Sequence, residues 1–363
     1  MSLLKFFSLG VFLFTTPFIS QAAELKFTAK AAPELEAPFQ NTNGWTGADA
    51  AFSIPLSKTK TVWLFGDTWV GEVRDGRRLH PKMINNSIAL QTLDESPNFF
   101  YRTNSKREAE SFVKPKEGDG FFWPFHGART EQGLFIFLHQ VKIVDSKSVF
   151  GFKVFGESFA TITNPDDAPA RWKIEQQKFP FATFSEKETI TFGAAVLRHD
   201  GFIYVYGGRS GKEKSKRGMI LARVPENMLA NFSEWRFFAN GIWKKNFHET
   251  TAIWPDGASE ASVSFHSSLG KFITVHSQGI GGKIVLRTAE SPAGPWSEPQ
   301  FIFQCPDMEI SKKVFCYAAK GHPELAANPN ELIVTYAANS FNFWEVLSDA
   351  RLYWPRFVRV EFK

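Results

Sequence analysis

Short runs in which apolar and polar residues alternate recur along the whole chain, and almost no segment has the spacing of an amphipathic helix. Alternation with a period of two is typical of β-strands, so the pattern predicts an all-β protein. Five of these runs resemble one another, at residues 62–67, 134–138, 202–207, 272–276 and 332–336. Successive runs begin 72, 68, 70 and 60 residues apart, which indicates an internal repeat.

Each run follows a shorter strand rich in small residues, and a β unit of this size cannot bury a core by itself. Four-stranded sheets arranged radially solve this problem in β-propellers, so we predict a five-bladed β-propeller. No Pro/Ser-rich linker interrupts the repeats, which favours one domain spanning residues 41–363. We place the blades at residues 47–93, 121–165, 191–226, 260–303 and 317–362.

The first 22 residues have the features of an export signal. Lys5 precedes an apolar run from Phe6 to Ile19, and a small-x-small sequence ends at Ala22. We expect cleavage after Ala22, an N-terminal extension at residues 23–40, and a periplasmic or secreted monomer. No later apolar stretch approaches the ~20 residues of a membrane-spanning helix, so no membrane span is predicted.

Charge and cysteine content narrow the class of protein only slightly. The formal net charge is +5, or +4 without Lys5, which fits either a solvated lysine-rich surface or an affinity for acidic envelope polymers. No basic motif interleaved with aromatic residues is present, so nucleic acid is not an expected partner. Cys305 and Cys316 lack zinc-ligand spacing, and the two alternatives are one local disulfide or two free thiols.

Acidic residues stand at or near the starts of the predicted blades, where a propeller brings side chains together at one mouth of its channel. Asp49 opens blade one, Asp67 ends the sequence WLFGD, and Glu260 opens blade four. Cleavage of a glycosidic bond needs one carboxyl group to protonate the leaving oxygen and another to activate water or attack the anomeric carbon. We therefore predict Asp49 as base or nucleophile, Asp67 as a group that orients the site or tunes a partner's pKa, and Glu260 as the acid.

These assignments have alternatives in the sequence. Asp49 and Asp67 also suit turns or caps, in which they would bond backbone N–H groups. Glu249 and Asp256 lie shortly before Glu260 and are rivals for its role.

Six further residues flank the same predicted face and are candidates for substrate binding: Trp45, Trp123, Arg129, Trp254, His322 and Glu324. Tryptophan rings stack on pyranose or furanose rings, although most of the 11 tryptophans must belong to the core. A channel histidine can bond a sugar, hold a cation through water or fill a polar core position. No cofactor is expected and no tight cluster indicates a metal, while a structural calcium held by scattered oxygens stays open.

Several motifs extend over nearly all of the chain that follows the signal. They are GWTGAD (residues 44–49), WLFGDT (63–68), NNS (85–87), FWP (122–124), RVP (223–225), TAES (288–291), GPW (294–296) and GHPE (321–324). Together they resemble the domain of unknown function 4185 (DUF4185) family, which implies a five-bladed propeller related in shape to glycoside hydrolase families 43, 32 and 68. Members of that family include endo-acting arabinofuranosidases that cut the D-arabinan of mycobacterial cell walls. The resemblance implies carboxylates at the channel mouth, here Asp49 and Asp67, with Glu260 matching the general acid of related glycosidases.

The leading hypothesis is a secreted or periplasmic glycoside hydrolase that acts on an envelope or environmental polysaccharide containing furanose sugars, such as an arabinan. One alternative is a non-catalytic glycan-binding propeller whose acids bind hydroxyl groups or calcium. Another is a protein-interaction propeller, which predicts a broad apolar patch in place of a polar mouth.

Overall fold

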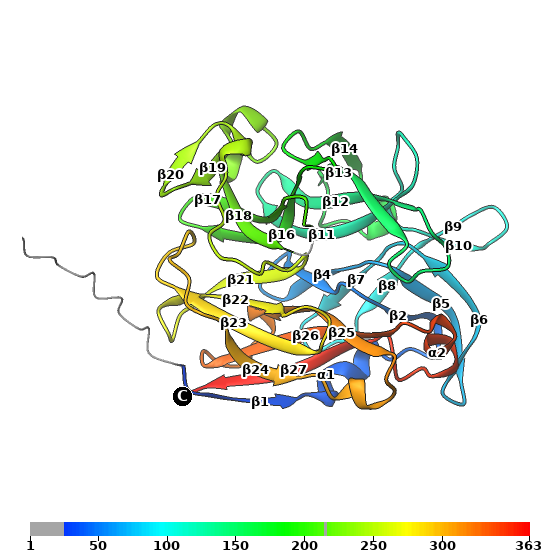
Figure 1. The fold of residues 1–363 in the computed structure, drawn as a ribbon. Helices are drawn as coiled ribbons and strands as arrows, with labels where there is room; N and C mark the ends of the chain where they lie inside the picture. The colour runs from blue at the N-terminus through cyan, green and yellow to red at the C-terminus, as the bar shows by residue number, and fades with distance from the viewer. Residues whose placement is uncertain (1–24, 214–215) are drawn as a thin grey trace, which may run out of the picture.

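The computed structural model describes residues 25–213 and 216–363, and the predicted signal peptide lies outside them. Within these residues the predicted all-β class is confirmed (Figure 1). Five antiparallel sheets of four or more strands follow one another along the described chain, and they are built mainly from consecutive strands.

The strands of the five sheets have the following bounds. The first sheet contains β3 (Phe52–Pro55), β4 (Lys60–Phe65), β7 (Ser87–Thr92) and β8 (Asn98–Phe100). The second contains β11 (Phe121–Thr130), β12 (Gly133–Ile143), β13 (Phe152–Ile162) and β14 (Ile174–Lys178). The third contains β15 (Thr183–Phe184), β16 (Thr189–His199), β17 (Phe202–Ser210), β18 (Arg217–Pro225), β19 (Arg236–Ala239) and β20 (Ile242–Lys244). The fourth contains β21 (Ala261–His266), β22 (Lys271–Ser277), β23 (Lys283–Ala289) and β24 (Gln300–Gln304). The fifth contains β25 (Val314–His322), β26 (Glu331–Ser340), β27 (Pro355–Phe362) and β1 (Phe27–Ala31).

The remaining elements are short. A three-stranded sheet contains β2 (Asn43–Ala48), β5 (Thr68–Arg74) and β6 (Arg77–Ile84). A two-stranded sheet contains β9 (Arg102–Thr103) and β10 (Ala109–Glu110). The α-helices are α1 (Pro33–Glu36) and α2 (Phe343–Ser348). The 3-10 helices are η1 (Ala37–Phe39), η2 (Pro169–Arg171), η3 (Glu226–Met228), η4 (Phe232–Glu234), η5 (Phe247–Glu249), η6 (Pro306–Glu309) and η7 (Pro323–Leu325). No helix in the described part of the chain is both long and apolar enough to cross a membrane.

One inner strand of each sheet packs against the inner strand of the next. Contacts run from β3 to β11, and then through β16 and β21 to β25. A hydrogen bond of 2.6 Å between Ser53 Oγ on β3 and His322 Nδ1 on β25 connects the last sheet to the first. The five repeated runs of the sequence lie at β4, β12, β17, β22 and β26, each of which pairs with the inner strand of its sheet.

The predicted blade limits differ from the sheets at several places. Blade one as predicted includes the β5–β6 hairpin, which instead joins β2 in a separate sheet. The second and third sheets extend past the predicted ends at residues 165 and 226, because β14, β19 and β20 follow there. These outer strands are only three to five residues long, so they contain too few alternating positions to stand out in the sequence.

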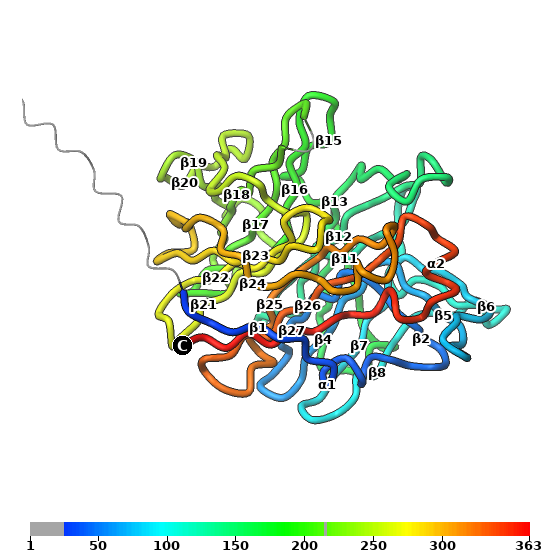
Figure 2. The backbone as a smooth tube through the Cα atoms, turned by 60° about the horizontal axis from the view of Figure 1, so that its bottom comes forward, coloured from blue at the N-terminus to red at the C-terminus, as the bar shows by residue number. Residues whose placement is uncertain are grey.

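The segment expected as an N-terminal extension supplies a strand of the fifth sheet. β1 pairs with β27 over its whole length, from Phe27 opposite Phe362 to Ala31 opposite Val358. The first and last strands of the described chain therefore lie side by side, as both views show (Figures 1 and 2). The fifth sheet is thus built from both ends of the chain.

Bulges interrupt three of the inner strands. The pairing register shifts between Pro124 and Gly127 in β11, between Phe192 and Ala195 in β16, and between Tyr317 and Lys320 in β25. Residues three apart on a regular strand point to opposite faces, and a bulge changes this alternation. In β25 the bulge lets Tyr317 and Lys320 both reach one group of acids.

The apolar core lies between neighbouring sheets, with its largest cluster among the first three. Trp172 and Trp235 on outer segments are buried in it, as expected of large rings that cover the gaps between sheets. Cys305 and Cys316 form a disulfide, which selects between the two alternatives left by the sequence. The bridge ties the segment after β24 to β25.

Candidate active site

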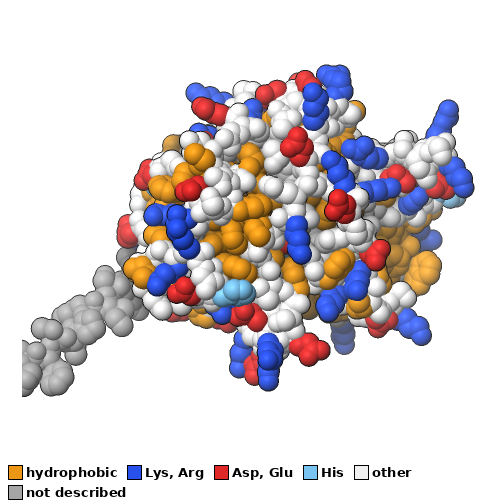
Figure 3. All heavy atoms as spheres, turned by 90° about the horizontal axis from the view of Figure 1, so that it is seen from above, with side chains coloured by type: hydrophobic (Ala, Val, Ile, Leu, Met, Phe, Trp, Pro, Cys, Tyr) orange, Lys and Arg blue, Asp and Glu red, His pale blue; other side chains and the backbone are white. Residues whose placement is uncertain are grey.

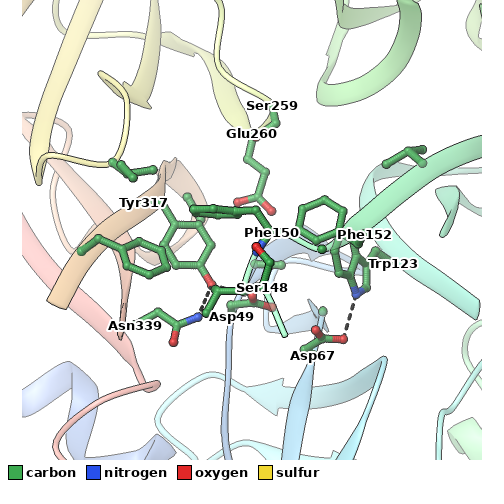
Figure 4. A pocket seen from close by; sticks show the side chains of 18 of the residues that line it. Asp49, Asp67, Trp123, Ser148, Phe150, Phe152, Ser259, Glu260, Tyr317 and Asn339 are labelled. Atoms are coloured by element: carbon green, nitrogen blue, oxygen red, sulfur yellow. Dashed lines mark hydrogen bonds between the residues drawn. The ribbon is translucent and has the colours of Figure 1, made fainter. Parts of the chain in front are cut away.

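A cavity of about 1500 Å³ opens where segments of all five sheets and their loops meet. The three acids predicted as catalytic, Asp49, Asp67 and Glu260, all line it. Figure 4 shows Glu260 on one side of the cavity, directed toward Asp49, with Asp67 beside Asp49. The fold thus brings together three carboxyl groups that are far apart in the sequence.

A strained turn presents Asp49 to the cavity. β2 ends one residue before Asp49, and the next two residues, Ala50 and Ala51, have φ values of 66° and 54°. This left-handed region is costly for a residue with a Cβ atom, and such strain concentrates at functional sites. The turn directs the chain from β2 into β3, and Asp49 lies at its start.

The backbones of Asp49 and Asp67 are joined directly. The Asp49 N–H donates to the carbonyl oxygen of Asp67 at 3.3 Å, and the Gly66 N–H donates to the carbonyl oxygen of Asp49 at 3.3 Å. A Cβ atom on Gly66 would lie only 2.5 Å from Asp49 Oδ1. The glycine of the WLFGD sequence is therefore needed for the close approach of the two aspartates.

Two tyrosine hydroxyls hold the Asp49 carboxyl group. Tyr317 and Tyr353 donate to Asp49 Oδ2 at 2.6 and 3.1 Å. Burial raises the pKa of Asp49 to about 8, the negative charges of Asp67 and Glu260 add to the rise, and the tyrosine hydrogen bonds oppose it. Asp49 therefore favours its protonated form near neutral pH.

Two N–H donors hold Asp67. The Trp123 indole donates to Asp67 Oδ1 at 2.8 Å, and the Asn85 side-chain amide donates to the same oxygen at 3.2 Å. Burial raises the pKa of Asp67 to about 6, and these two hydrogen bonds oppose the rise. Asp67 thus loses its proton at a lower pH than Asp49.

Glu260 differs from both aspartates because it has a cationic partner. It lies just before β21, and the Lys320 ammonium donates to Glu260 Oε2 at 3.2 Å. The side chains of Lys320 and Glu260 are 2% and 14% exposed, so this ion pair is largely shielded from water.

Apolar and aromatic side chains form much of the cavity wall. Seven of the 13 large hydrophobic residues exposed in the described chain line the cavity: Met83, Ile143, Phe150, Ile280, Phe341, Phe343 and Trp344. One face of the molecule, seen from above, also carries hydrophobic side chains near its middle and charged ones around its edge (Figure 3). Aromatic walls beside carboxyl groups suit the apolar faces and hydroxyl groups of a sugar.

The tip of the β12–β13 hairpin reaches across the cavity. Phe150 on this tip packs against Phe315 and Phe341 beside the fifth sheet, with ring centroids 5.7 and 5.9 Å apart. Ser148 and Phe150 line the same cavity as Asp49 (Figure 4). The hairpin therefore links the second and fifth sheets near the acids.

Of the predicted substrate-binding residues, Trp123 lies at the cavity. Trp45 and Trp254 do not line it and are buried in core clusters, so their rings are not accessible to a sugar. Arg129 also lies away from the cavity lining and pairs with Asp166 at 3.2 Å. Tryptophans at strand starts were expected at the face of the molecule, but large apolar rings gain more from burial between sheets.

His322 and Glu324 form a buried polar group beside the core. The two ring nitrogens of His322 lie 2.6 Å from Ser53 Oγ and 2.7 Å from Thr335 Oγ1, so both are engaged within the protein. Burial lowers the pKa of His322 well below its usual range. Ser53 also donates to Glu324, and neither predicted ligand lines the cavity. Of the three roles that the sequence left open for His322, this arrangement supports the polar core position.

Asp256 and Glu249, the two alternatives to Glu260 as the catalytic acid, lie in different parts of the structure. Asp256 lines the cavity, whereas Glu249 pairs with Lys244 at 3.5 Å on the surface.

Four residues at the site were not predicted from the sequence: Asn85, Tyr317, Lys320 and Tyr353. Tyr317 and Tyr353 are separated from Asp49 by 268 and 304 residues, and no local pattern marks either one. Lys320 lies three residues after the predicted start of blade five at residue 317. A lysine in a strand of otherwise small and apolar residues was the signal that could have identified it. Asn85 belongs to the NNS motif.

One group of potential metal ligands occurs among the described residues, Cys305, Asp307 and Cys316. Its two sulfur atoms form the disulfide, and Asp307 pairs with Arg356 at 2.7 Å. A disulfide lacks the oxygen ligands that calcium prefers, so this group does not fit the structural calcium considered above.

Comparison with solved structures finds similar folds. A protein from Bacteroides ovatus, described as a candidate hydrolase, matches with a TM-score of 0.73 and 20% identity over 92% of this chain and 90% of its own. A family 117 glycoside hydrolase produced by Zobellia galactanivorans matches with a TM-score of 0.50 and 10% identity over 93% and 91%. A GH43_1 enzyme from Xanthomonas citri complexed with xylose has a TM-score of 0.49 and 16% identity over 92% and 90%. At these identities the first two matches concern the fold.

Comparison with curated proteins finds no match. The DUF4185 name inferred from the motifs is not supported, since the family model that matches is a different one. That model covers residues 34–362, which is nearly the whole described chain. The chain therefore belongs to the family described as domain of unknown function (DUF5005).

Proposed function

We propose that this protein is a glycoside hydrolase that cleaves a polysaccharide with the carboxyl groups of Asp49 and Glu260, while Asp67 tunes Asp49. The observation that carries the proposal is the convergence of three acids on one large cavity with aromatic walls. Glycosidic hydrolysis needs two carboxyl groups in different protonation states, and the different partners of Asp49 and Glu260 provide for this. The fold likeness to a family 117 glycoside hydrolase agrees with this reaction class.

We further propose that the five sheets are the blades of a five-bladed propeller, with β1 completing the last blade. The substrate class that we favour is a furanose-containing polysaccharide of the cell envelope or the environment, such as an arabinan. We place the protein in the periplasm or outside the cell, and the disulfide between Cys305 and Cys316 supports an oxidising compartment.

The test is the release of reducing ends from arabinans, arabinogalactans, fructans and xylans by the purified mature protein. Asp49→Asn should lower the rate by ~10²–10⁴-fold, because proton transfer by a positioned carboxyl contributes about this much. Asp166→Asn is the matched control, since Asp166 is exposed and lies away from the cavity lining.

Release by the wild-type protein and the control, but not by Asp49→Asn, would establish the hydrolase and its substrate class. No release from any polymer, together with glycan binding that survives Asp49→Asn, would instead indicate the non-catalytic glycan-binding protein.

A further inference from the structure

Lys320 is a buried cation whose hydrogen-bonding capacity is fully used inside the protein. Its ammonium group donates to Glu260 Oε2 at 3.2 Å, to the Ala318 carbonyl at 2.7 Å and to the Ala50 carbonyl. The same nitrogen lies 4.3 Å from the centre of the Phe52 ring. An ammonium has three donors, and all three have acceptors here, so Lys320 has no N–H left for a sugar.

The contacts of Lys320 reach both sides of the proposed site. Ala50 directly follows Asp49 and belongs to the strained turn, and Glu260 lies across the cavity. Ala318 has a φ of 60° in the bulge of β25, which turns its carbonyl and the Lys320 side chain toward the same place. Lys320 therefore fixes the position of Glu260 relative to the turn that bears Asp49.

Asp49 has no such cation. Its carboxyl group is hydrogen-bonded by two neutral hydroxyl groups, those of Tyr317 and Tyr353, and no ion pair of 4 Å or less includes Asp49 within the described residues. The Lys320 ammonium thus lies near the carboxyl groups of Glu260 and Asp49, with Asp67 beside Asp49. The other charged residues that line the cavity are Asp145, Lys147, Arg217 and Asp256.

Like charges held close together in a shielded site favour a proton on one of the groups without a cation, which are Asp49 and Asp67. The two partners of Asp67 are N–H groups, which can only donate and therefore favour its carboxylate form, whereas the tyrosine hydroxyls on Asp49 can also accept a hydrogen bond from its protonated form.

We infer that Lys320 is a positioning residue that keeps Glu260 ionised and leaves the proton of the cluster on Asp49, which makes Asp49 the acid and Glu260 the base of the hydrolysis. This inference rests on the proposed function. It reverses the roles expected from the sequence, in which Asp49 is the base and Glu260 the acid.

In the reaction, Asp49 gives its proton to the glycosidic oxygen as the bond from that oxygen to the anomeric carbon breaks. A water oxygen forms the new bond to the anomeric carbon, and the Glu260 carboxylate takes the proton that this water loses. One water is consumed and two hydroxyl groups are formed. Transfer of the proton from Glu260 back to Asp49 through solvent restores the starting state.

The electrostatic surroundings of each group agree with this division. Asp49 is faced by Asp67, Glu260, Tyr317, Tyr353 and Lys320. Lys320 is faced by Glu260, Asp49, His126 and His322, and burial lowers the pKa of both histidines so that they stay neutral. The pKa of Asp49, raised by burial to about 8, lies above that of Asp67, raised to about 6, so Asp49 is the last of the two aspartates to ionise.

The first test compares Asp49→Asn with Glu260→Gln on arabinan, 4-nitrophenyl arabinofuranoside and 2,4-dinitrophenyl arabinofuranoside. A variant without the acid should lose most activity on arabinan but less than about tenfold on the dinitrophenyl glycoside, because that leaving group needs no proton. A variant without the base should lose activity on all three substrates and recover with added azide, which needs no base. We expect the first behaviour from Asp49→Asn and the second from Glu260→Gln, and the reverse result would overturn the assignment.

The second test concerns Lys320 itself. In Lys320→Met the base loses its cation, so the acidic limb of the pH–rate profile should move up by ~1–3 units. Lys320→Arg should move it less, and Lys312→Met, at an exposed lysine, should not move it. A loss of rate without movement of the limb would show that Lys320 is merely structural.

A third measurement requires no substrate and no Lys320 variant. Carbon-13 NMR of the aspartate and glutamate carboxyl groups, assigned with Asp49→Asn and Glu260→Gln, follows the ionisation of each group in the folded protein. The inference is supported if Glu260 ionises at a lower pH than Asp49, and it is rejected if Asp49 ionises at the lower pH. If the wild-type protein cleaves no polymer, the proposed function fails while this measurement still decides where the proton lies.

Discussion

Single atoms decide how closely the two aspartates approach. Asp49 Oδ1 lies against Gly66, where an added Cβ would be only 2.5 Å away. The two tyrosine hydroxyls donate to Asp49 Oδ2, so contacts on both oxygens fix the orientation of this carboxyl group. Asp67 is held in the same way by Trp123 and Asn85. A preformed arrangement of this kind is what proton transfer at a fixed place requires.

Gly66→Ala should therefore reduce activity by about tenfold or more, because it displaces the Asp49 carboxyl group and a misplacement of ~1 Å can cost 10²-fold. Steady-state rates on the polymer cleaved by the wild-type protein measure the effect. Gly211→Ala is the control, since an added Cβ there meets no atom within 4 Å. Equal rates for Gly66→Ala and the wild-type protein would contradict the role of this contact.

Asp49 should also make stability depend on pH. Its pKa is raised from 3.8 to about 8, so the folded protein binds this proton more tightly than the unfolded chain does. The stabilisation is complete below pH ~4 and is lost progressively, by about 1.4 kcal/mol for each pH unit, until the pH has risen through ~8. The total loss is on the order of 5 kcal/mol. Asp49→Asn removes this dependence, so its melting temperature relative to the wild-type protein should rise between pH 5 and pH 9.

Thermal unfolding monitored by circular dichroism at several pH values provides this comparison. Asp166→Asn should show no such trend, because Asp166 is exposed. A constant difference between Asp49→Asn and the wild-type protein across the pH range would argue against a raised pKa in the folded state.

At the scale of elements, turns next to strands carry the three acids, while a long hairpin and a short helix supply part of the cavity wall. The β12–β13 hairpin contributes Phe150, and α2 contributes Phe343 and Trp344. Trp344 is the most exposed of these side chains, at 72%, although it lines the cavity. A large exposed ring beside a polar site suits a sugar that extends beyond the acids.

Trp344→Ala should consequently weaken polymer binding about tenfold, or ~1.4 kcal/mol, without changing the rate at saturation. Affinity electrophoresis in the Asp49→Asn background measures binding without cleavage. Phe301→Ala is the matched control, because Phe301 is 49% exposed on β24 and lies outside the cavity lining. Equal retardation of the Trp344→Ala and Phe301→Ala proteins would exclude a sugar contact at α2.

At the scale of the whole molecule, two links hold the last sheet in place. β1 pairs with β27, so both ends of the described chain lie in one sheet. The disulfide between Cys305 and Cys316 joins the segment after the fourth sheet to β25, the strand that bears Tyr317 and Lys320. Both links act on the sheet that supplies the most contacts to the acids.

Replacing both cysteines by serine should lower the free energy of unfolding by ~2–3 kcal/mol, as for a short loop closed by a disulfide. The melting temperature of the oxidised wild-type protein should fall to that of the double variant when a reductant is added. Activity at 25 °C should persist in the variant, since neither cysteine lines the cavity. Equal melting temperatures with and without reductant would show that the bridge does not contribute.

Much of the fold was predictable because it depends on local patterns. Alternation marked the strands, and the spacing of the repeated runs located β4, β12, β17, β22 and β26. The outer strands β14, β19 and β20 were missed because each has at most five residues. The pairing of β1 with β27 was missed because the two strands lie at opposite ends of the chain.

The sequence by itself determined the all-β class, the repeat and the presence of acids at the starts of strands, since these follow from neighbouring residues. Only the tertiary structure decided which residues share the cavity: it joined Tyr317, Tyr353 and Lys320 to the acids and buried Trp45 and Trp254 in the core. The physical reason is that hydrogen bonds, ion pairs and burial depend on distance in space, which strand pairing and bulges set across hundreds of residues.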